Sequence, residues 1–102
     1  MQNAVAELYK LGKMPQETDS VEKIQTFQDL IEEVKSPITD EEAKYLVNLF
    51  NDSQDDCYGL AWLVIHLIET APNWPIEECL TEKGYWIDFL KHRAINAGWI
   101  HI

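Results

Sequence analysis

Apolar residues recur every three or four positions along most of the chain, the spacing that places them on one side of an α-helix. The clearest example ends before Ser36-Pro37, because the residue that precedes a proline disfavours helical geometry. It comprises Val21, Ile24, Phe27, Leu30, Ile31 and Val34. A shorter pattern covers about residues 2–11 and ends at Gly12, a typical C-cap residue. The first third of the chain is therefore predicted to form two amphipathic helices.

Capping residues predict where the helices begin. In a capping box, an N-cap side chain and the residue three positions later each accept a hydrogen bond from the other's backbone N–H. Three pairs have this spacing: Asp19 with Glu22, Thr39 with Glu42, and Ser53 with Asp56. They predict helices that begin near residues 20, 40 and 54, and the last of these extends to about residue 71.

Two further helices are predicted in the C-terminal third. Pro75 is suited to the first position of a short helix that ends at Leu80. Thr81 is the predicted N-cap of a last helix over about residues 82–97. The apolar tail Trp99–Ile102 is expected to fold back onto the body of the protein.

The predicted helix over residues 54–71 is apolar on more than one side, so we expect it to be the central element. Its buried edge is predicted to comprise Cys57, Leu60, Ala61, Val64, Leu67, Ile68 and Ala71, with Leu63 and Ile65 beside it. Short connections between consecutive helices favour antiparallel neighbours. We expect an all-α fold over residues 1–102 as a single helical domain, either stacked antiparallel αα-hairpins or a compact helical bundle of five to six helices.

The charge balance narrows the choice of partners. Eighteen acidic against eight basic residues give a formal net charge of −10 in 102 residues. A field of this sign repels nucleic acid and anionic membranes and attracts basic proteins. Improved solubility alone is the alternative explanation for this charge. No apolar run approaches the length of a membrane span and the N-terminus lacks the pattern of a signal peptide, so the expected location is cytoplasmic.

No group of residues has the spacing of a catalytic or metal site. Cys57 and His66 are nine positions apart on one predicted helix, about 13 Å along its axis, and both cysteines are expected to be reduced core residues. Zinc would need Cys57, His66, Cys79 and His92, which lack the close ligand pairs of structural zinc sites. We therefore expect no enzyme activity, metal or cofactor. A small hydrolase or metal enzyme remains the alternative, and elemental analysis would detect its metal.

A surface is the remaining candidate for function. Asp55, Tyr58, Trp62, His66 and Glu69 recur at helical spacing, opposite the buried edge that begins at Cys57. On the last helix, Tyr85, Asp88, His92 and Asn96 share a face directed away from Trp86, Phe89, Leu90 and Arg93. If the two helices are neighbours, these faces line a shallow concavity suited to binding a protein. The alternative is that Trp62 lies in the core under the first hairpin and that His66 is an interior histidine.

The segment from Asp55 to Pro72, DDCYGLAWLVIHLIETAP, resembles the HEAT-like all-α immunity proteins of bacterial polymorphic and contact-dependent toxin systems. These proteins tend to carry an acidic helix start followed by an apolar segment that ends in a stretch like His-Leu-Ile-Glu. The resemblance covers only this segment, and its motif has no catalytic logic. The residues that it indicates are Asp55, Asp56, Tyr58, Trp62, His66 and Glu69.

This resemblance implies a cytoplasmic immunity protein that binds one cognate toxin domain, often a basic nuclease, and blocks its active site. Together with the helical face described above, it predicts a partner-binding set of Asp55, Asp56, Tyr58, Trp62, His66, Glu69, Tyr85, Asp88 and His92. The chain is expected to be a monomer when free and to bind no nucleic acid and no membrane. The alternative function is a general helical adaptor or regulatory subunit, which would form homo-oligomers.

Overall fold

The computed structural model describes residues 1–51, 53–81 and 83–99. Its α-helices are α1 (Asn3–Leu11), α2 (Val21–Glu33), α3 (Asp40–Val47), α4 (Leu60–Ile68) and α5 (Tyr85–Asn96), and a short 3-10 helix, η1 (Glu77–Leu80), precedes α5. These described residues contain no strand, which confirms the all-α prediction. Within the same ranges, none of the helices combines the length and the apolar run that a membrane span requires.

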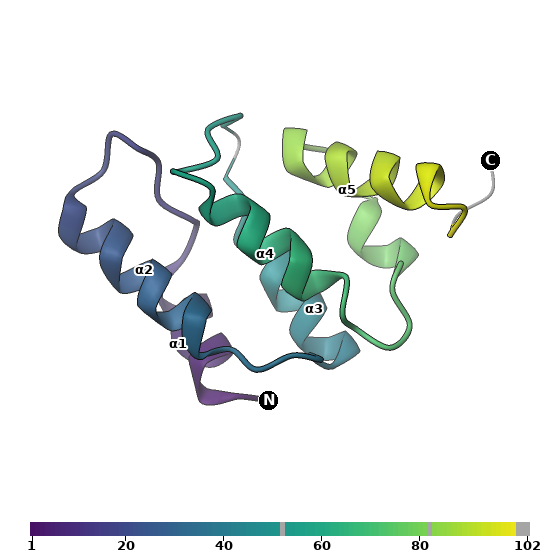
Figure 1. Ribbon diagram of the computed structural model, residues 1–102, viewed down its shortest axis with the longest axis horizontal. Coiled ribbons are helices and arrows are strands. Elements are labelled where there is room, and N and C mark those ends of the chain that lie inside the picture. Colours follow the sequence, from purple (N-terminus) through teal and green to yellow (C-terminus); the bar gives the residue numbers. More distant parts are fainter. Residues whose placement is uncertain (52, 82, 100–102) are drawn as a thin grey trace.

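The helices form a compact bundle built from hairpins. Helices α1 and α2 run in opposite directions and pack together, as do α3 and α4 (Figure 1). The two hairpins lie side by side, because α1 also packs against α3 and α2 against α4. The bundle continues with α5, on which η1 packs, and its dimensions are 41 × 27 × 18 Å. The five-helix bundle is therefore a row of stacked hairpins, and both forms of the predicted fold describe it.

Helix α4 lies at the centre of this row. It packs against α3 and also against α2, as its apolar sequence predicted. The predicted edge residues Leu60, Ala61, Val64 and Ile68 are buried, and so is Ile65. Burying a valine, leucine or isoleucine side chain stabilises the fold by about 1.5–3 kcal/mol. Helix α4 thus contributes five buried residues to a core to which the other helices also contribute.

A single buried carboxylate connects α3 to the start of α1. The predicted capping box forms: the Thr39 hydroxyl accepts from the Glu42 N–H at 3.1 Å, and Glu42 Oε1 accepts from the Thr39 N–H at 2.9 Å. Glu42 Oε2 also accepts from the Gln2 N–H at 2.9 Å. The Gln2 side chain in turn exchanges two hydrogen bonds with the backbone of Lys35, just after α2. This chain of bonds links three helices at one end of the bundle.

The protonation state of Glu42 follows from these bonds. Burial opposes ionisation of Glu42, but the N–H donors of Thr39 and Gln2 outweigh burial and hold the pKa of this carboxyl below its usual value. The side chain is therefore charged at neutral pH although it is buried.

The N-cap of α2 differs from the prediction. Ser20 caps the helix, since its hydroxyl accepts from the Lys23 N–H at 3.2 Å. The predicted cap, Asp19, instead accepts from the Gln16 N–H at 2.7 Å in the preceding turn. Val21, the first residue of the predicted apolar edge, is 80% exposed. The buried side of α2 therefore begins one turn later than the sequence pattern indicates.

The prediction that the central helix begins near residue 54 is wrong. The Ser53 hydroxyl accepts from the Asp55 N–H at 3.0 Å, and Asp55 Oδ1 accepts from the Cys57 N–H at 2.7 Å. Cys57, Tyr58 and Gly59 then have positive φ angles of 49°, 56° and 87°. These side chain-to-backbone bonds compete with helical hydrogen bonding. The capping box of Ser53 and Asp56 does not form, and α4 begins only at Leu60.

The C-terminal helices are also shorter than predicted. The 3-10 helix η1 begins at Glu77, two residues after Pro75. Thr81 does not cap α5; its hydroxyl donates to the Glu78 carbonyl at 3.0 Å, and α5 begins at Tyr85. In the apolar tail, Trp99 is half exposed. Residues 100–102, on which the predicted folding back of the tail depends, lie outside the described residues.

Replacing Glu42 tests the buried carboxylate. We expect Glu42→Gln to lower the free energy of unfolding by about 2–3 kcal/mol, because an amide presents one acceptor where two backbone N–H groups need acceptors. The matched control Glu41→Gln, an exposed acid in the same turn, is expected to cost less than about 1 kcal/mol. Urea denaturation monitored by circular dichroism measures both. Equal effects of the two substitutions would contradict this assignment.

The same carboxylate predicts a pH dependence. Because the folded-state pKa of Glu42 lies below its unfolded-state value, its stabilising effect is present at neutral pH and is lost as the pH falls through the folded-state pKa. The free energy of unfolding of the wild-type protein is therefore expected to fall more steeply on acidification than that of Glu42→Gln. Parallel pH profiles of the two proteins would refute this.

Candidate protein-binding surface

Trp62 is held in a fixed position at the surface between α4 and α5. Its side chain is 37% exposed, so it is not a core residue. The Phe89 ring meets it edge to face, with the ring centroids 5.2 Å apart and an interplanar angle of 89°. The Arg93 guanidinium lies over the indole, 5.9 Å from its centroid. Aromatic and cation–π contacts of this kind are each worth about 0.5–1.5 kcal/mol, and together they hold the indole in one orientation.

Arg93 is itself held by Glu69. Arg93 Nε donates to Glu69 Oε2 at 2.8 Å, and Arg93 Nη2 donates to Glu69 Oε1 at 2.7 Å. The Glu69 side chain is only 11% exposed and that of Arg93 35%. The hydrogen bonds to Glu69 raise the pKa of Arg93. Each oxygen of Glu69, a predicted partner-binding residue, accepts one hydrogen bond from Arg93, so Glu69 positions the Arg93 guanidinium.

A hollow of about 440 Å³ opens beside this ion pair, between the C-terminal parts of α4 and α5. It is lined by Glu69, Arg93, Asn96, Ala97 and Trp99. Of the residues predicted to line a concavity between the two helices, only Glu69 and Asn96 line this hollow.

The term Trp62 surface is used below for Trp62, His66, Tyr85, Phe89 and Arg93. The His66 ring lies 6.3 Å from the Trp62 ring, and the Tyr85 ring is stacked on Phe89 at 6.4 Å. All five side chains are exposed or partly exposed. The predicted residues Trp62, His66 and Tyr85 are thus brought together, joined by two residues that were predicted to point inward.

Asp88 and His92, also predicted on this face, are exposed but separate from it. In the described part of the chain, neither makes a hydrogen bond, ion pair or aromatic contact with α4. The α5 residues that contact Trp62 or Glu69 are instead Phe89 and Arg93. The signal for them was present in the sequence, because Tyr85, Phe89 and Arg93 follow each other at four-residue intervals and so share one side of a helix.

Carboxylates gather in the turn before α4. The carboxylate oxygens of Glu17, Asp55 and Asp56 lie within 4.8 Å of one another. Asp55 Oδ2 accepts from the Glu17 N–H at 2.8 Å, so part of this cluster holds the turn together. Calcium sites use about six to eight oxygen ligands, so three carboxylates do not define one. Exposed Tyr58 lies in the same turn, which is therefore negatively charged and carries an aromatic side chain.

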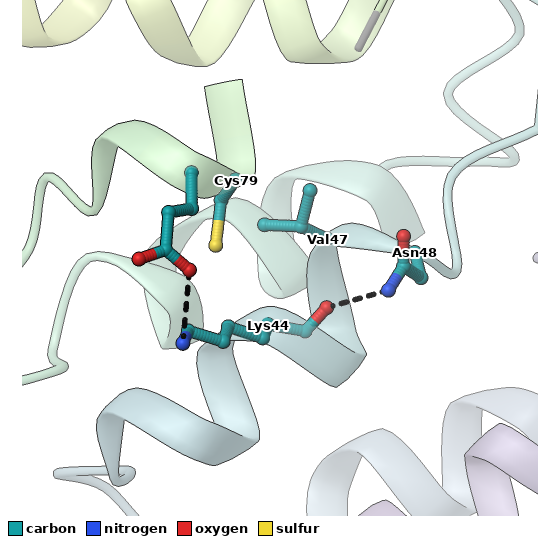
Figure 2. A pocket seen from close by; sticks show the side chains of 5 residues that line it. Lys44, Val47, Asn48 and Cys79 are labelled. Atoms are coloured by element: carbon teal, nitrogen blue, oxygen red, sulfur yellow. Dashed lines mark hydrogen bonds and ion pairs between the residues drawn. The ribbon is translucent and has the colours of Figure 1, made fainter. Parts of the chain in front are cut away.

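The two thiols do not have the surroundings of a nucleophile. Burial, followed by the nearby carboxylates of Asp55, Glu17, Asp19 and Asp56, raises the pKa of Cys57. Burial also raises the pKa of Cys79, which lines a small hollow between α3 and η1 (Figure 2). Lys44 also lines this hollow, and its Nζ forms an ion pair with Glu78 Oε2 at 3.4 Å. Both thiols are therefore protonated at neutral pH.

The ion pair between Glu69 and Arg93 is predicted to stabilise the contact of α4 with α5. We expect Glu69→Gln to lower the free energy of unfolding by about 1–3 kcal/mol, because it leaves a partly buried guanidinium without its counter-charge. Glu78→Gln is the matched control, since Glu78 and Lys44 form an exposed pair that should contribute less than about 1 kcal/mol. A double-mutant cycle of Glu69→Gln with Arg93→Met, measured by urea denaturation, isolates the interaction. A coupling energy near zero would contradict the prediction.

No protein-family model, curated protein or solved structure matches the chain.

Proposed function

We propose that this protein binds and neutralises a basic protein partner, and that it is an immunity protein that covers the active site of a cognate bacterial toxin domain. The observation that supports this most directly is the Trp62 side chain, which is exposed at the surface and yet held by Phe89 and Arg93.

A fixed, exposed tryptophan is suited to anchoring a partner. Trp, Tyr and Arg are the residues most often responsible for binding energy in protein interfaces. The Trp62 surface combines one of each with Phe89 and His66. Because Glu69 and Phe89 already hold Arg93 and Trp62 in place, little side-chain freedom would be lost on binding. This reduces one of the main costs of association.

The charge distribution favours a basic partner. Among the described residues, four of the eight basic side chains are engaged with the protein's own carboxylates, namely Lys10, Lys23, Lys44 and Arg93. The remaining excess of acids includes the cluster that Asp55 and Asp56, in the turn before α4, form with Glu17 of the α1–α2 connection. Such a surface accelerates association with a cationic protein and disfavours neutral or acidic ones.

The proposal of a toxin partner comes from the resemblance of residues 55–72. This segment contains the acidic turn, Trp62 and Glu69, so the resemblance falls on the part of the chain that presents the candidate surface. A nuclease active site attracts phosphates and is therefore cationic, which matches an acidic inhibitor.

A neighbouring reading frame tests the toxin proposal. We expect the gene immediately upstream to encode a large secreted protein with a variable C-terminal domain, which arrests growth when it is expressed alone. Co-expression of this protein should restore growth, and the two should co-purify. An upstream domain that is harmless, or whose toxicity this protein leaves unchanged, would overturn the proposal.

The double variant Trp62→Ala with Asp56→Lys tests the surface. We expect it to weaken binding to the purified toxin domain at least about 30-fold, since central tryptophans contribute about 2 kcal/mol or more and charge reversal removes steering. The control Tyr9→Ala with Glu7→Lys changes an exposed aromatic residue and an acid on α1 and should alter affinity less than about threefold. Circular dichroism checks that both variants keep their helices. Equal losses in the two variants would refute the role of the Trp62 surface.

The quaternary state separates this proposal from a general helical adaptor. A free binding protein of this charge should elute as a monomer in gel filtration, and its association rate with the partner should fall as salt is raised. Stable homo-oligomers together with salt-independent binding would favour the adaptor.

A further inference from the structure

A second hollow adjoins the Trp62 surface, between α2 and α4. It has a volume of about 300 Å³. Buried Ile31 and Val34 from the end of α2 and half-buried Leu67 from α4 form its apolar part, and Leu63, Glu32 and His66 also line it. Leu63 is 42% exposed in the middle of α4, an unusual position for a leucine on the most apolar helix. A hollow of this size accommodates one or two side chains rather than a whole helix.

His66 makes this hollow continuous with the Trp62 surface. It lines the hollow, and its ring also lies 6.3 Å from the Trp62 ring. A partner that covers Trp62 could therefore contact the hollow at the same time.

One acid, Glu32, lines the hollow, and Glu33 follows it on α2. Glu32 and Glu33 occupy the last turn of α2, where the helix dipole disfavours negative charge, and this turn contains no basic residue. Within the described ranges, neither carboxylate forms an ion pair. Glu32 accepts one hydrogen bond, from the Gln28 amide at 3.2 Å. The acids in the first turn of α3, by contrast, are stabilised by the dipole of that helix.

We propose that this hollow takes an aliphatic side chain of the basic partner, and that a lysine or arginine next to this side chain pairs with Glu32. The inference rests on the proposed function and adds a second contact to it. The apolar lining favours an apolar group, and exposed Glu32, which forms no ion pair within the described ranges, favours a cation beside it. A second copy of this chain would bring the same acids and a further charge of −10 to the interface, so self-association does not suit the hollow.

An NMR titration with a short peptide tests the hollow apart from the whole partner. The probe is acetyl-Lys-Leu-Lys-amide, added at millimolar concentration to the full ¹⁵N-labelled chain. We expect the largest shift changes at the amides of Leu63, His66 and Thr70. Acetyl-Lys-Gly-Lys-amide should bind roughly tenfold more weakly because it lacks the aliphatic side chain, and acetyl-Glu-Leu-Glu-amide should not bind because its charge is repelled.

Substitutions at the apolar lining and at the acids of α2 identify the groups involved. Leu63→Asn should weaken binding of the Lys-Leu-Lys peptide about tenfold, whereas Leu11→Asn, at a leucine that is 50% exposed on α1, should leave it unchanged. Glu32→Gln with Glu33→Gln should weaken binding to a similar extent and also raise Tm by roughly 2–6 °C, because it removes unfavourable charge from the end of α2. Tyr9→Ala, at an aromatic residue that is 53% exposed on α1, should change peptide affinity less than about twofold.

The outcomes separate this inference from the proposed function. Three outcomes would each overturn the proposal that the hollow takes an aliphatic side chain: shift changes confined to the Trp62 surface, no binding at all, or equal binding of the Leu and Gly peptides. If the peptide binds in the hollow but the upstream domain is not neutralised, the toxin proposal is overturned and the proposed contact in the hollow is retained.

Discussion

The bidentate ion pair between Glu69 and Arg93 determines the geometry of the candidate surface. It joins the end of α4 to α5 in a place where water has limited access, and a guanidinium held by two hydrogen bonds has little freedom to reorient. Arg93 in that position covers one side of Trp62, while Phe89 meets the ring edge to face. An exposed aromatic residue thereby becomes a rigid feature of the protein, and the proposed binding function depends on this rigidity.

The acidic residues fall into two groups with different physical roles. Glu42 and Glu69 are largely buried and accept hydrogen bonds, Glu42 from the N–H groups of Thr39 and Gln2 and Glu69 from Arg93, so they contribute to the fold. Glu32 and Glu33 are exposed at the end of α2, where the dipole disfavours them. The net charge of −10 therefore does not arise from the requirements of folding alone. Attraction of the proposed basic partner would explain the acids of the second group.

Local capping signals alone did not decide where the helices begin. The capping box of Thr39 and Glu42 formed as predicted, because it needs only four consecutive residues. The similar pair Ser53 and Asp56 failed, since Ser53 and Asp55 instead satisfy backbone N–H groups within the turn and the chain passes through positive φ angles at Cys57 to Gly59. Nothing in the spacing of these residues distinguishes the two cases, because the competing hydrogen bonds are equally short-range.

Hydrophobic periodicity and charge were sufficient to predict an all-α protein with α4 at its centre, since helices bury the stripe that their own spacing creates. They left open whether Trp62 and His66 lie at the surface or in the core, and the structure exposes both side chains. The roles of Glu69, Phe89 and Arg93 were decided only by the tertiary structure, because an ion pair between residues 24 positions apart depends on how two helices meet. For the same reason, the hollow between α2 and α4 exists only after two hairpins have packed side by side.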